Sequence, residues 1–158
     1  MENEIKNILD CELKKVELSI NNYNYVFVVS DDIEIRNYFI NNISKLDNVS
    51  VIDDSKTQSD EVLANTLKDC NVLLLNAEIK AEQLRKLNNK NDLYNSLYYR
   101  LVFKREFLAK YKKSIIIVCD EHAIKPILCE NQSLVSVSNI LFVDDNIKEE
   151  KNKIKIKK

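Results

Sequence analysis

The stretch "YVFVVSDDIEIRNYF" (residues 25–39) decides the fold, because it passes from a buried strand directly into a helix. Residues 25–30 form an apolar run that is rich in β-branched and aromatic side chains and too short for a helix. Apolar residues then recur at helical spacing, at Ile35, Phe39, Ile43 and Leu46. We expect Ser30 or Asp31 to be the N-cap of that helix, since short polar side chains satisfy the first free N–H groups.

The same alternation continues along the chain. Further short apolar runs predict strands at 49–52, 71–76, 114–118 and 139–143. Amphipathic segments predict helices at 3–18, 58–68, 79–88, 93–112 and 121–128. Continuously apolar strands that alternate with helices indicate a parallel sheet covered on both faces. We therefore predict one α/β domain over residues 1–146, a three-layer sandwich with a five-stranded, mainly parallel, Rossmann-like sheet and an extra N-terminal helix.

The end of the chain differs from the rest in charge. The net charge is −1, yet residues 148–158 carry six lysines and two glutamates, a local charge of +4 that leaves −5 for the other residues. No core pattern is visible after Asn146, so we expect residues 147–158 to be a basic, flexible tail. The alternation in "KIKIK" leaves an edge strand as the alternative. A helix after the fifth strand is not expected.

Composition argues against several other classes of protein. No run approaches the roughly 18 apolar residues of a membrane span, and the charged start is no secretory signal. One histidine and four cysteines without a C-x-x-C pair provide few ligands for a zinc site. We expect a cytoplasmic protein without metal or cofactor.

Glycine is absent from all 158 residues, where average usage of about 7% would give about eleven. A phosphate-binding loop needs converging backbone N–H groups at positive φ with no Cβ in the way. The chain therefore contains neither the G-x-x-x-x-G-K-[ST] motif nor the G-x-G-x-x-G motif of nucleotide-binding proteins. We expect asparagine to serve the left-handed turns instead, at residues 21–22, 41–42 and 88–89.

Polar residues follow the predicted strands at the carboxyl edge, where open α/β sheets carry their sites. They define a candidate vestigial cleft of Asp31, Asp32, Asn76, Glu78 and Asp120. The aspartates 31 and 32, with Glu78, would form a residual metal site, or they would cap a helix, which is favourable by itself. Cys119 beside His122 raises the weaker alternative of a nucleophile and base.

The residues "VFVVSDDIEIR" (26–36) resemble the opening of a response-regulator receiver, a strand followed by an acidic pair and a helix. The resemblance implies magnesium bound by the pair and a phosphoryl-accepting aspartate after the third strand. Asn76 stands at that position and cannot attack phosphorus, and the lysine expected after the fifth strand is replaced by acids in "FVDDN". On this alternative the chain is a phosphorylation-independent pseudo-receiver.

A second resemblance covers residues 12–143. The segment "LVFKREFLAKYKKSIIIVCDEHAIKPI" (101–127) is similar to the L-N-x-R-R-E-x-L-A helix, strand and short helix of degenerate P-loop domains in the STAND and AAA-type ATPase superfamily. "SLVSVSNILFV" (133–143) resembles the D-L-W-S-W-R-S-G-V-F-like segment of that group. The helix before the first strand and the absence of one after the fifth also suit this group better than a receiver. The matching residues are Lys104, Arg105, Glu106 and Leu108; three residues depart from the pattern, Val102 in place of asparagine and Val135 and Val137 in place of tryptophans.

This resemblance implies that "SDDIEIR" (30–36) replaces a Walker A loop and that Asn76 replaces the Mg²⁺-binding aspartate of Walker B. Without both parts phosphoryl transfer loses its positioning and charge stabilisation. We therefore expect no enzyme but a pseudo-ATPase-like interaction or scaffold module, in a signalling or anti-phage defence assembly as the family implies. The alternatives are a replication helper resembling a helicase loader and an enzyme that uses the acidic pocket.

The helix at 93–112 has an apolar arc wider than a helix needs for covering one sheet face. We expect a partner surface there that presents Tyr99, Phe103 and Phe107 as aromatic anchors, with burial under neighbouring helices as the alternative. The expected partners are proteins. Nucleic acid would bind only weakly, through the basic tail, a membrane is not expected, and a homo-oligomer is compatible with the sequence.

Overall fold

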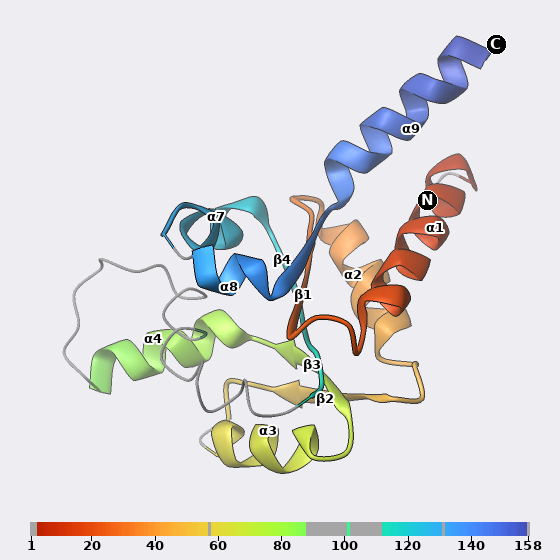
Figure 1. The fold of residues 1–158 in the computed structure, drawn as a ribbon. Coiled ribbons are helices and arrows are strands. Elements are labelled where there is room, and N and C mark those ends of the chain that lie inside the picture. The colour runs from red at the N-terminus through yellow and green to blue at the C-terminus, as the bar shows by residue number, and fades with distance from the viewer. Residues whose placement is uncertain (1–2, 57, 88–100, 102–111, 131, 158) are drawn as a thin grey trace.

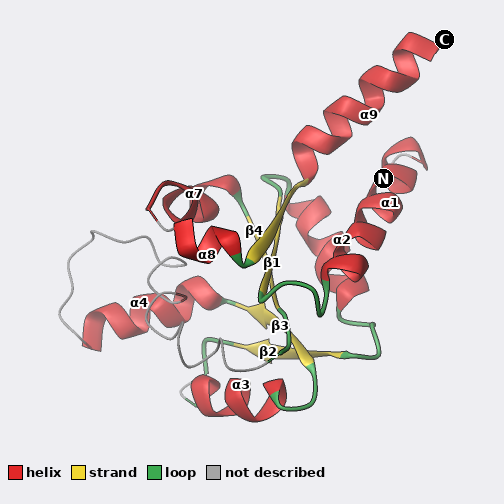
Figure 2. Ribbon diagram, in the orientation of Figure 1, coloured by secondary structure: helices red, strands yellow, loops and turns green. Residues whose placement is uncertain are grey.

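A computed structural model describes residues 3–56, 58–87, 101, 112–130 and 132–157. Its centre is a five-stranded, all-parallel sheet with helices on both faces (Figures 1 and 2). The strands are β1 (Tyr25–Val29), β2 (Val49–Asp53), β3 (Asn71–Leu75), β4 (Ile115–Cys119) and β5 (Ser138–Phe142). Their order across the sheet is β2-β3-β4-β1-β5. The expected three-layer α/β architecture is confirmed.

The helices form two layers. Their bounds are α1 (Asn3–Ser19), α2 (Ile33–Ile43), α3 (Ser59–Leu67), α4 (Ala77–Leu87), α7 (Glu121–Glu130), α8 (Gln132–Ser136) and α9 (Val143–Lys157). Apolar side chains of α1, α2 and α9 pack in one core cluster with one face of the sheet, and those of α3, α7 and α8 pack with the other.

Strand β1 shows why the apolar runs predict the fold so well. All five of its residues are buried, because alternate side chains enter opposite cores. Val26 and Val28 face the α1, α2 and α9 layer, whereas Tyr25 and Phe27 face the other layer, with their ring centroids 6.2 Å apart. Two buried faces require continuous rather than alternating hydrophobicity.

Two local expectations need correction. The N-cap of α2 is Asp32, whose carboxylate accepts a hydrogen bond from the backbone N–H of Glu34, and neither Ser30 nor Asp31. Among the described residues the left-handed conformation occurs at Asn21 (φ 73°) and Asn76 (φ 61°). Residues 41–42 lie inside α2, because the apolar stripe carries the helix past them. Residues 88–89 lie outside the described part of the chain.

The expectation of an irregular tail or edge strand after Asn146 is wrong, since α9 runs from Val143 to Lys157. Val143 and Ile147 are buried in the core beside α1 and α2. Figure 1 shows α9 lying alongside α1, with both helices extending beyond the sheet. The absence of a helix after the fifth strand, one feature that favoured the P-loop resemblance, therefore does not hold.

The proposed anchors Tyr99, Phe103 and Phe107 lie outside the described residues. Leu101, which is described, is buried with 1% of its surface exposed. No helix in the described part of the chain is long and apolar enough to cross a membrane.

Candidate functional site

The turn between β1 and α2 lies where a nucleotide-binding fold would hold phosphate, and a carboxylate from α9 closes it. Ser30 is buried, and its hydroxyl donates a hydrogen bond to Oδ1 of Asp144 at 2.6 Å. The backbone N–H of Asp31 donates to Oδ2 of the same carboxylate at 2.9 Å. Both oxygens of Asp144 thus bind the donors that would otherwise face a ligand.

The turn is also held from within. The backbone N–H of Asp32 donates to the Ser30 hydroxyl oxygen at 3.1 Å, and a guanidinium N–H of Arg36 donates to the Ser30 carbonyl at 2.7 Å. Arg36 lies on the first turns of α2, so the helix itself anchors the preceding strand end. The result is a turn with several internal hydrogen bonds and no glycine.

The acidic residues of the predicted cleft cap helices. Asp31 Oδ1 accepts from the backbone N–H of Glu121 at 3.0 Å, where α7 begins. Asp120 Oδ1 accepts from the N–H of Ala123 at 2.9 Å, and Asp32 caps α2. Because the first N–H groups of a helix lack partners inside it, each carboxylate satisfies a structural need. For Asp31 and Asp32, these contacts agree with the alternative that the two aspartates cap helices.

Asn76 belongs to a second, separate cluster at the ends of β2 and β3. Its side-chain amide donates to Oδ1 of Asp53 at 3.0 Å. Ser55 donates to the same oxygen from its backbone N–H at 3.0 Å and from its hydroxyl at 2.6 Å. These hydrogen bonds, that from Asn76 first, hold the pKa of Asp53 at about 2, below its ordinary 3.8.

Helix α4 fastens the chain that follows β2. The ammonium group of the buried Lys80 donates to the carbonyl of Lys56 at 3.3 Å, and the amide of Gln83 donates to the carbonyl of Ser55 at 3.3 Å. Glu78 is exposed beside them. Among the described residues no hydrogen bond joins Asn76 or Glu78 to the aspartates after β1, so the predicted cleft divides into two clusters.

Cys119 is a poor nucleophile in this setting. Burial raises the pKa of its thiol to about 12, with smaller contributions from the negative charges of Asp120 and Glu78. A thiol with that pKa stays protonated at neutral pH, and the thiolate is the reactive form. His122 is exposed at the start of α7, where it lines a hollow of about 370 Å³ with Lys125 and Phe142. The arrangement does not favour the nucleophile-and-base alternative.

Metal-binding geometry is not apparent either. The described residues contain no group of three or more His, Cys, Asp or Glu side chains placed to hold a metal ion. The carboxylates at the strand ends instead accept backbone N–H groups, as given above. A groove of about 580 Å³ does open beside Asp144, between α1, α2 and α9, and it has mixed charge through Asp31, Asp32, Lys148 and Lys151.

Two residues central to these clusters, Asp144 and Asp53, were not among the predicted site residues. The available signal for Asp144 was the acidic pair that follows the fifth strand in "FVDDN". Carboxyl ends of parallel strands share one edge, so acids after β5 can reach the turn after the adjacent β1. Asp53 ends β2 in the same way, next to Asn76 at the end of β3.

Comparisons with known proteins identify no family for this chain. No family model matches the sequence, and no curated protein matches it. One similar solved structure is described as "Structure of Drosophila ORC bound to DNA", with a TM-score of 0.47 and 10% identity over 90% of this chain and 93% of that chain. A likeness at this level supports no conclusion about function.

Proposed function

We propose that this chain is a non-catalytic, pseudo-ATPase-like domain that acts as a protein interaction or scaffold module. The observation that carries the proposal is the Asp144 carboxylate in the turn after β1, where it accepts hydrogen bonds from the Ser30 hydroxyl and the Asp31 N–H. A phosphate group would need those same donors. The domain has filled the position with its own anion.

Charge supports the same proposal. Asp31, Asp32 and Asp144 place three carboxylates around a groove in which a nucleotide would bring several more negative charges. Like charges at short distance repel, and a catalytic site would need a lysine, arginine or metal ion at the phosphates to offset them. Lys148 and Lys151 also line the groove, but the donors of the turn itself are bound by the Asp144 carboxylate. Arg36, which contacts the turn, donates to the Ser30 carbonyl.

Strand order supports the P-loop resemblance over the receiver. The sheet order β2-β3-β4-β1-β5 differs from the order 2-1-3-4-5 of flavodoxin-like folds, which include the receivers. The strand order therefore argues against the receiver, and the P-loop resemblance is the one on which the proposal rests. The role in a signalling or defence assembly rests on the family resemblance alone.

Titration calorimetry with ATP and GTP in the presence of Mg²⁺ tests the loss of nucleotide binding. We expect no binding heat at nucleotide concentrations up to about 1 mM. A Kd below about 100 μM for either nucleotide would contradict the proposal. Phosphate release in the same mixtures should equal release without protein, and a rate that falls on mutation of Asp31 or Asp144 would show an active site instead.

A further inference from the structure

We propose that the outer edge of β2 pairs with the same edge of a second copy of this chain, so that two sheets join across a two-fold axis. The inference names a partner for the interaction module proposed above. It rests on the backbone geometry of β2 and not on the occupied turn after β1, so either proposal can fail alone.

Strand β2 is the outermost strand of the sheet, with β3 as its single neighbour in the strand order. The other outer strand, β5, is better covered, because every one of its side chains is at least half-buried. Asn139 of β5 also donates a hydrogen bond to the Ser19 hydroxyl of α1. Among the described elements, β2 therefore offers the open edge.

The hydrogen bonds beside β2 show which backbone groups point outward. The N–H of Asp54 donates to the carbonyl of Leu75 at 2.7 Å, and the N–H of Asn71 donates to the carbonyl of Asn48 at 3.0 Å. Even-numbered residues thus turn their N–H and C=O groups toward β3. Because these directions alternate along a strand, Val49, Val51 and Asp53 direct theirs away from the sheet.

Two of the outward groups have partners close by in sequence. The N–H of Val49 donates to the Leu46 carbonyl at 3.2 Å, and the Asp53 carbonyl accepts from the N–H of Lys56 at 3.4 Å. Four groups have no backbone partner in the part of the chain that the structure describes: the Val49 carbonyl, both groups of Val51, and the Asp53 N–H.

An antiparallel pairing centred on Val51 uses these four groups and no others. The Val51 N–H of each copy donates to the Val51 carbonyl of the other, and each Asp53 N–H donates to the opposite Val49 carbonyl. A longer ladder would also join the Val49 N–H of each copy to the opposite Asp53 carbonyl. Both groups already have partners within their own chain, so the paired segment ends at these residues with one hydrogen bond each. The edge is therefore self-complementary under a two-fold rotation, as a symmetric dimer requires.

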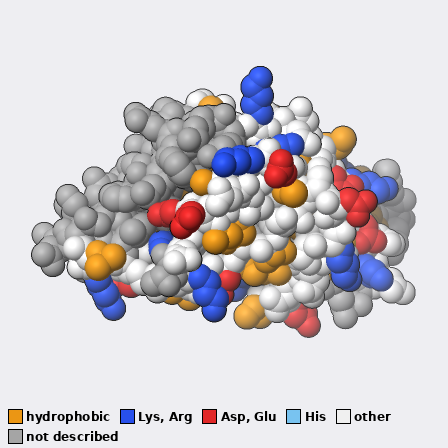
Figure 3. All heavy atoms as spheres, turned by 90° about the horizontal axis from the view of Figure 1, so that it is seen from below, with side chains coloured by type: hydrophobic (Ala, Val, Ile, Leu, Met, Phe, Trp, Pro, Cys, Tyr) orange, Lys and Arg blue, Asp and Glu red, His pale blue; other side chains and the backbone are white. Residues whose placement is uncertain are grey.

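The side chains of β2 fit the same pairing. Val51 has 45% of its surface exposed, and at the two-fold axis it would pack against its own copy. Residues 49–52 contain no lysine, proline or bulge, the devices by which proteins prevent edge pairing. The charge of Asp53 is already engaged by Asn76 and Ser55. Seen from the side of α3 and β2 (Figure 3), apolar side chains lie in small groups between charged ones, which suits a small interface.

Sedimentation equilibrium of the full chain from about 10 μM to about 1 mM tests the proposal. One five-residue strand makes a small interface, so we expect a weak, reversible dimer within that range. Val51→Lys should weaken dimerisation by at least about tenfold, since it places two like charges opposite one another. The matched control is Val62→Lys on α3, where the valine is 47% exposed, and this variant should dimerise like the wild type.

A backbone variant and a cross-link test the geometry itself. Val51→Pro removes an outward N–H that β3 does not use, so it should abolish the dimer while the fold remains, as measured by circular dichroism. In a background with Cys11→Ser and Cys129→Ser, Val51→Cys should form a disulfide-linked dimer under mild oxidation, because paired Cα atoms lie about 5.5 Å apart. Val62→Cys should not. A wild-type chain that stays monomeric throughout the range, or a Val51→Lys variant that dimerises as well as the wild type, would overturn the proposal, whether or not Val51→Pro folds.

Discussion

Ser30 and Asp144 stand 114 positions apart in the sequence, and the Ser30 hydroxyl donates a hydrogen bond to Oδ1 of Asp144 at 2.6 Å. The contact joins the end of β1 to the first turn of α9. Ser30 is buried, so its hydroxyl would lose its acceptor if the carboxylate were removed. This contact therefore both closes the turn after β1 and fixes the start of the last helix.

Asp144→Ala should lower the free energy of unfolding by about 2 kcal/mol, because a buried hydroxyl and a backbone N–H lose a charged acceptor. Asp145→Ala is the matched control, since Asp145 is exposed on the same turn of α9. The control removes the same charge near the helix N-terminus, and we expect it to cost less than about 1 kcal/mol. Urea denaturation of both variants measures the difference. Equal losses would show that the bidentate contact adds nothing to stability.

The sheet was predictable because its signal is local. Each strand lies in a short, mostly apolar run, and the predicted bounds differ from the observed ones by one residue or less. Strands β1 and β3 are buried along almost their whole length, whereas β2 leaves Val51 exposed. No long-range information is needed to recognise "NVLLL" or "IIIVC" as buried strands. The layers of helices then follow from the alternation along the chain.

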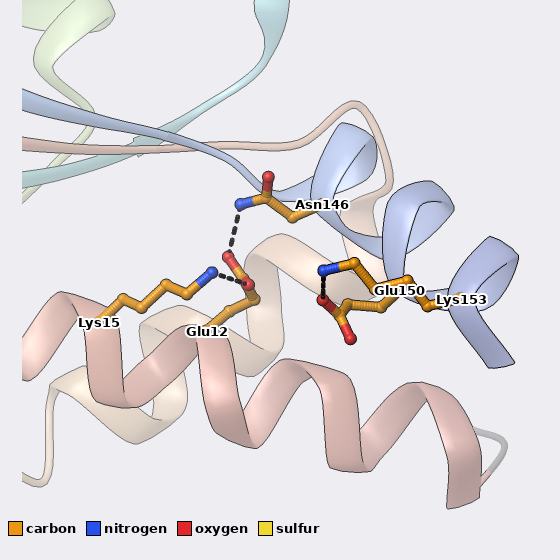
Figure 4. A network of polar contacts seen from close by, with 5 residues as sticks. All are labelled: Glu12, Lys15, Asn146, Glu150 and Lys153. Carbon is orange, nitrogen blue, oxygen red and sulfur yellow. Dashed lines mark hydrogen bonds and ion pairs between the residues drawn. The ribbon is translucent and has the colours of Figure 1, made fainter. Parts of the chain in front are cut away.

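Helix α9 was missed because its apolar signal is sparse. Two buried residues near its start, Val143 and Ile147, anchor it in the core, and a half-buried Ile154 follows seven positions later among lysines. A run of mostly charged residues is typical of a disordered tail when the surface beneath it is unknown. That surface is α1, where the buried Glu12 accepts hydrogen bonds from Asn146 and Lys15, both at 2.7 Å (Figure 4).

The sequence predicted where the residues of the candidate cleft lie, but it did not predict which groups they contact. The rule that sites lie at carboxyl ends of parallel strands put the acids at one edge of the sheet. It did not reveal that Asp31 caps α7, or that Asn76 contacts Asp53 and not the aspartates after β1. Those pairings depend on the strand order, which the local pattern of a single sequence does not show.

Asn76→Gly should raise the pKa of Asp53 from about 2 toward its ordinary 3.8, because the Asn76 amide is the first cause of the lowering. Glycine is the suitable replacement, since residue 76 has a φ of 61° and glycine adopts that conformation without strain. Carboxyl NMR titration measures the shift. Asn21→Gly, at a φ of 73°, is the control and should leave the pKa of Asp53 unchanged.

The sign for stability follows from the same values. A carboxylate whose pKa is lowered in the folded state stabilises the fold above its unfolded pKa, and this contribution is lost as the pH falls through the folded pKa. The contribution of Asp53 should therefore disappear between about pH 4 and pH 2. Urea midpoints of the wild type and Asp53→Asn should converge over that interval. A constant gap across it would show that the Asp53 charge is not involved.

Cys119 should react far more slowly with iodoacetamide than the exposed Cys11 and Cys129. Its pKa is raised to about 12, chiefly by burial, so almost no thiolate is present at pH 8. Mass spectrometry of peptides after timed alkylation gives the rate for each cysteine. Modification of Cys119 at the rate of the exposed pair would mean that the end of β4 opens to solvent, and would revive the nucleophile alternative.

Deleting residues 147–158 should lower the melting temperature markedly, although the sequence alone suggested no effect. The decisive side chain is Ile147, with 8% of its surface exposed in the core between α1, α2 and α9. Ile147→Ala should reduce the free energy of unfolding by about 2–4 kcal/mol, the usual cost of truncating a buried isoleucine. Thermal and urea denaturation measure both changes.

Ile156→Ala provides the matched comparison on the same helix, because Ile156 is 84% exposed. Both substitutions replace isoleucine by alanine in α9, so the gain in helix propensity is shared and cancels in the comparison. Ile156→Ala should change the free energy of unfolding by less than about 0.5 kcal/mol. If Ile147→Ala proved equally mild, the packing of α9 against α1 would contribute nothing to stability, and the basic segment would behave as the free tail that its composition suggested.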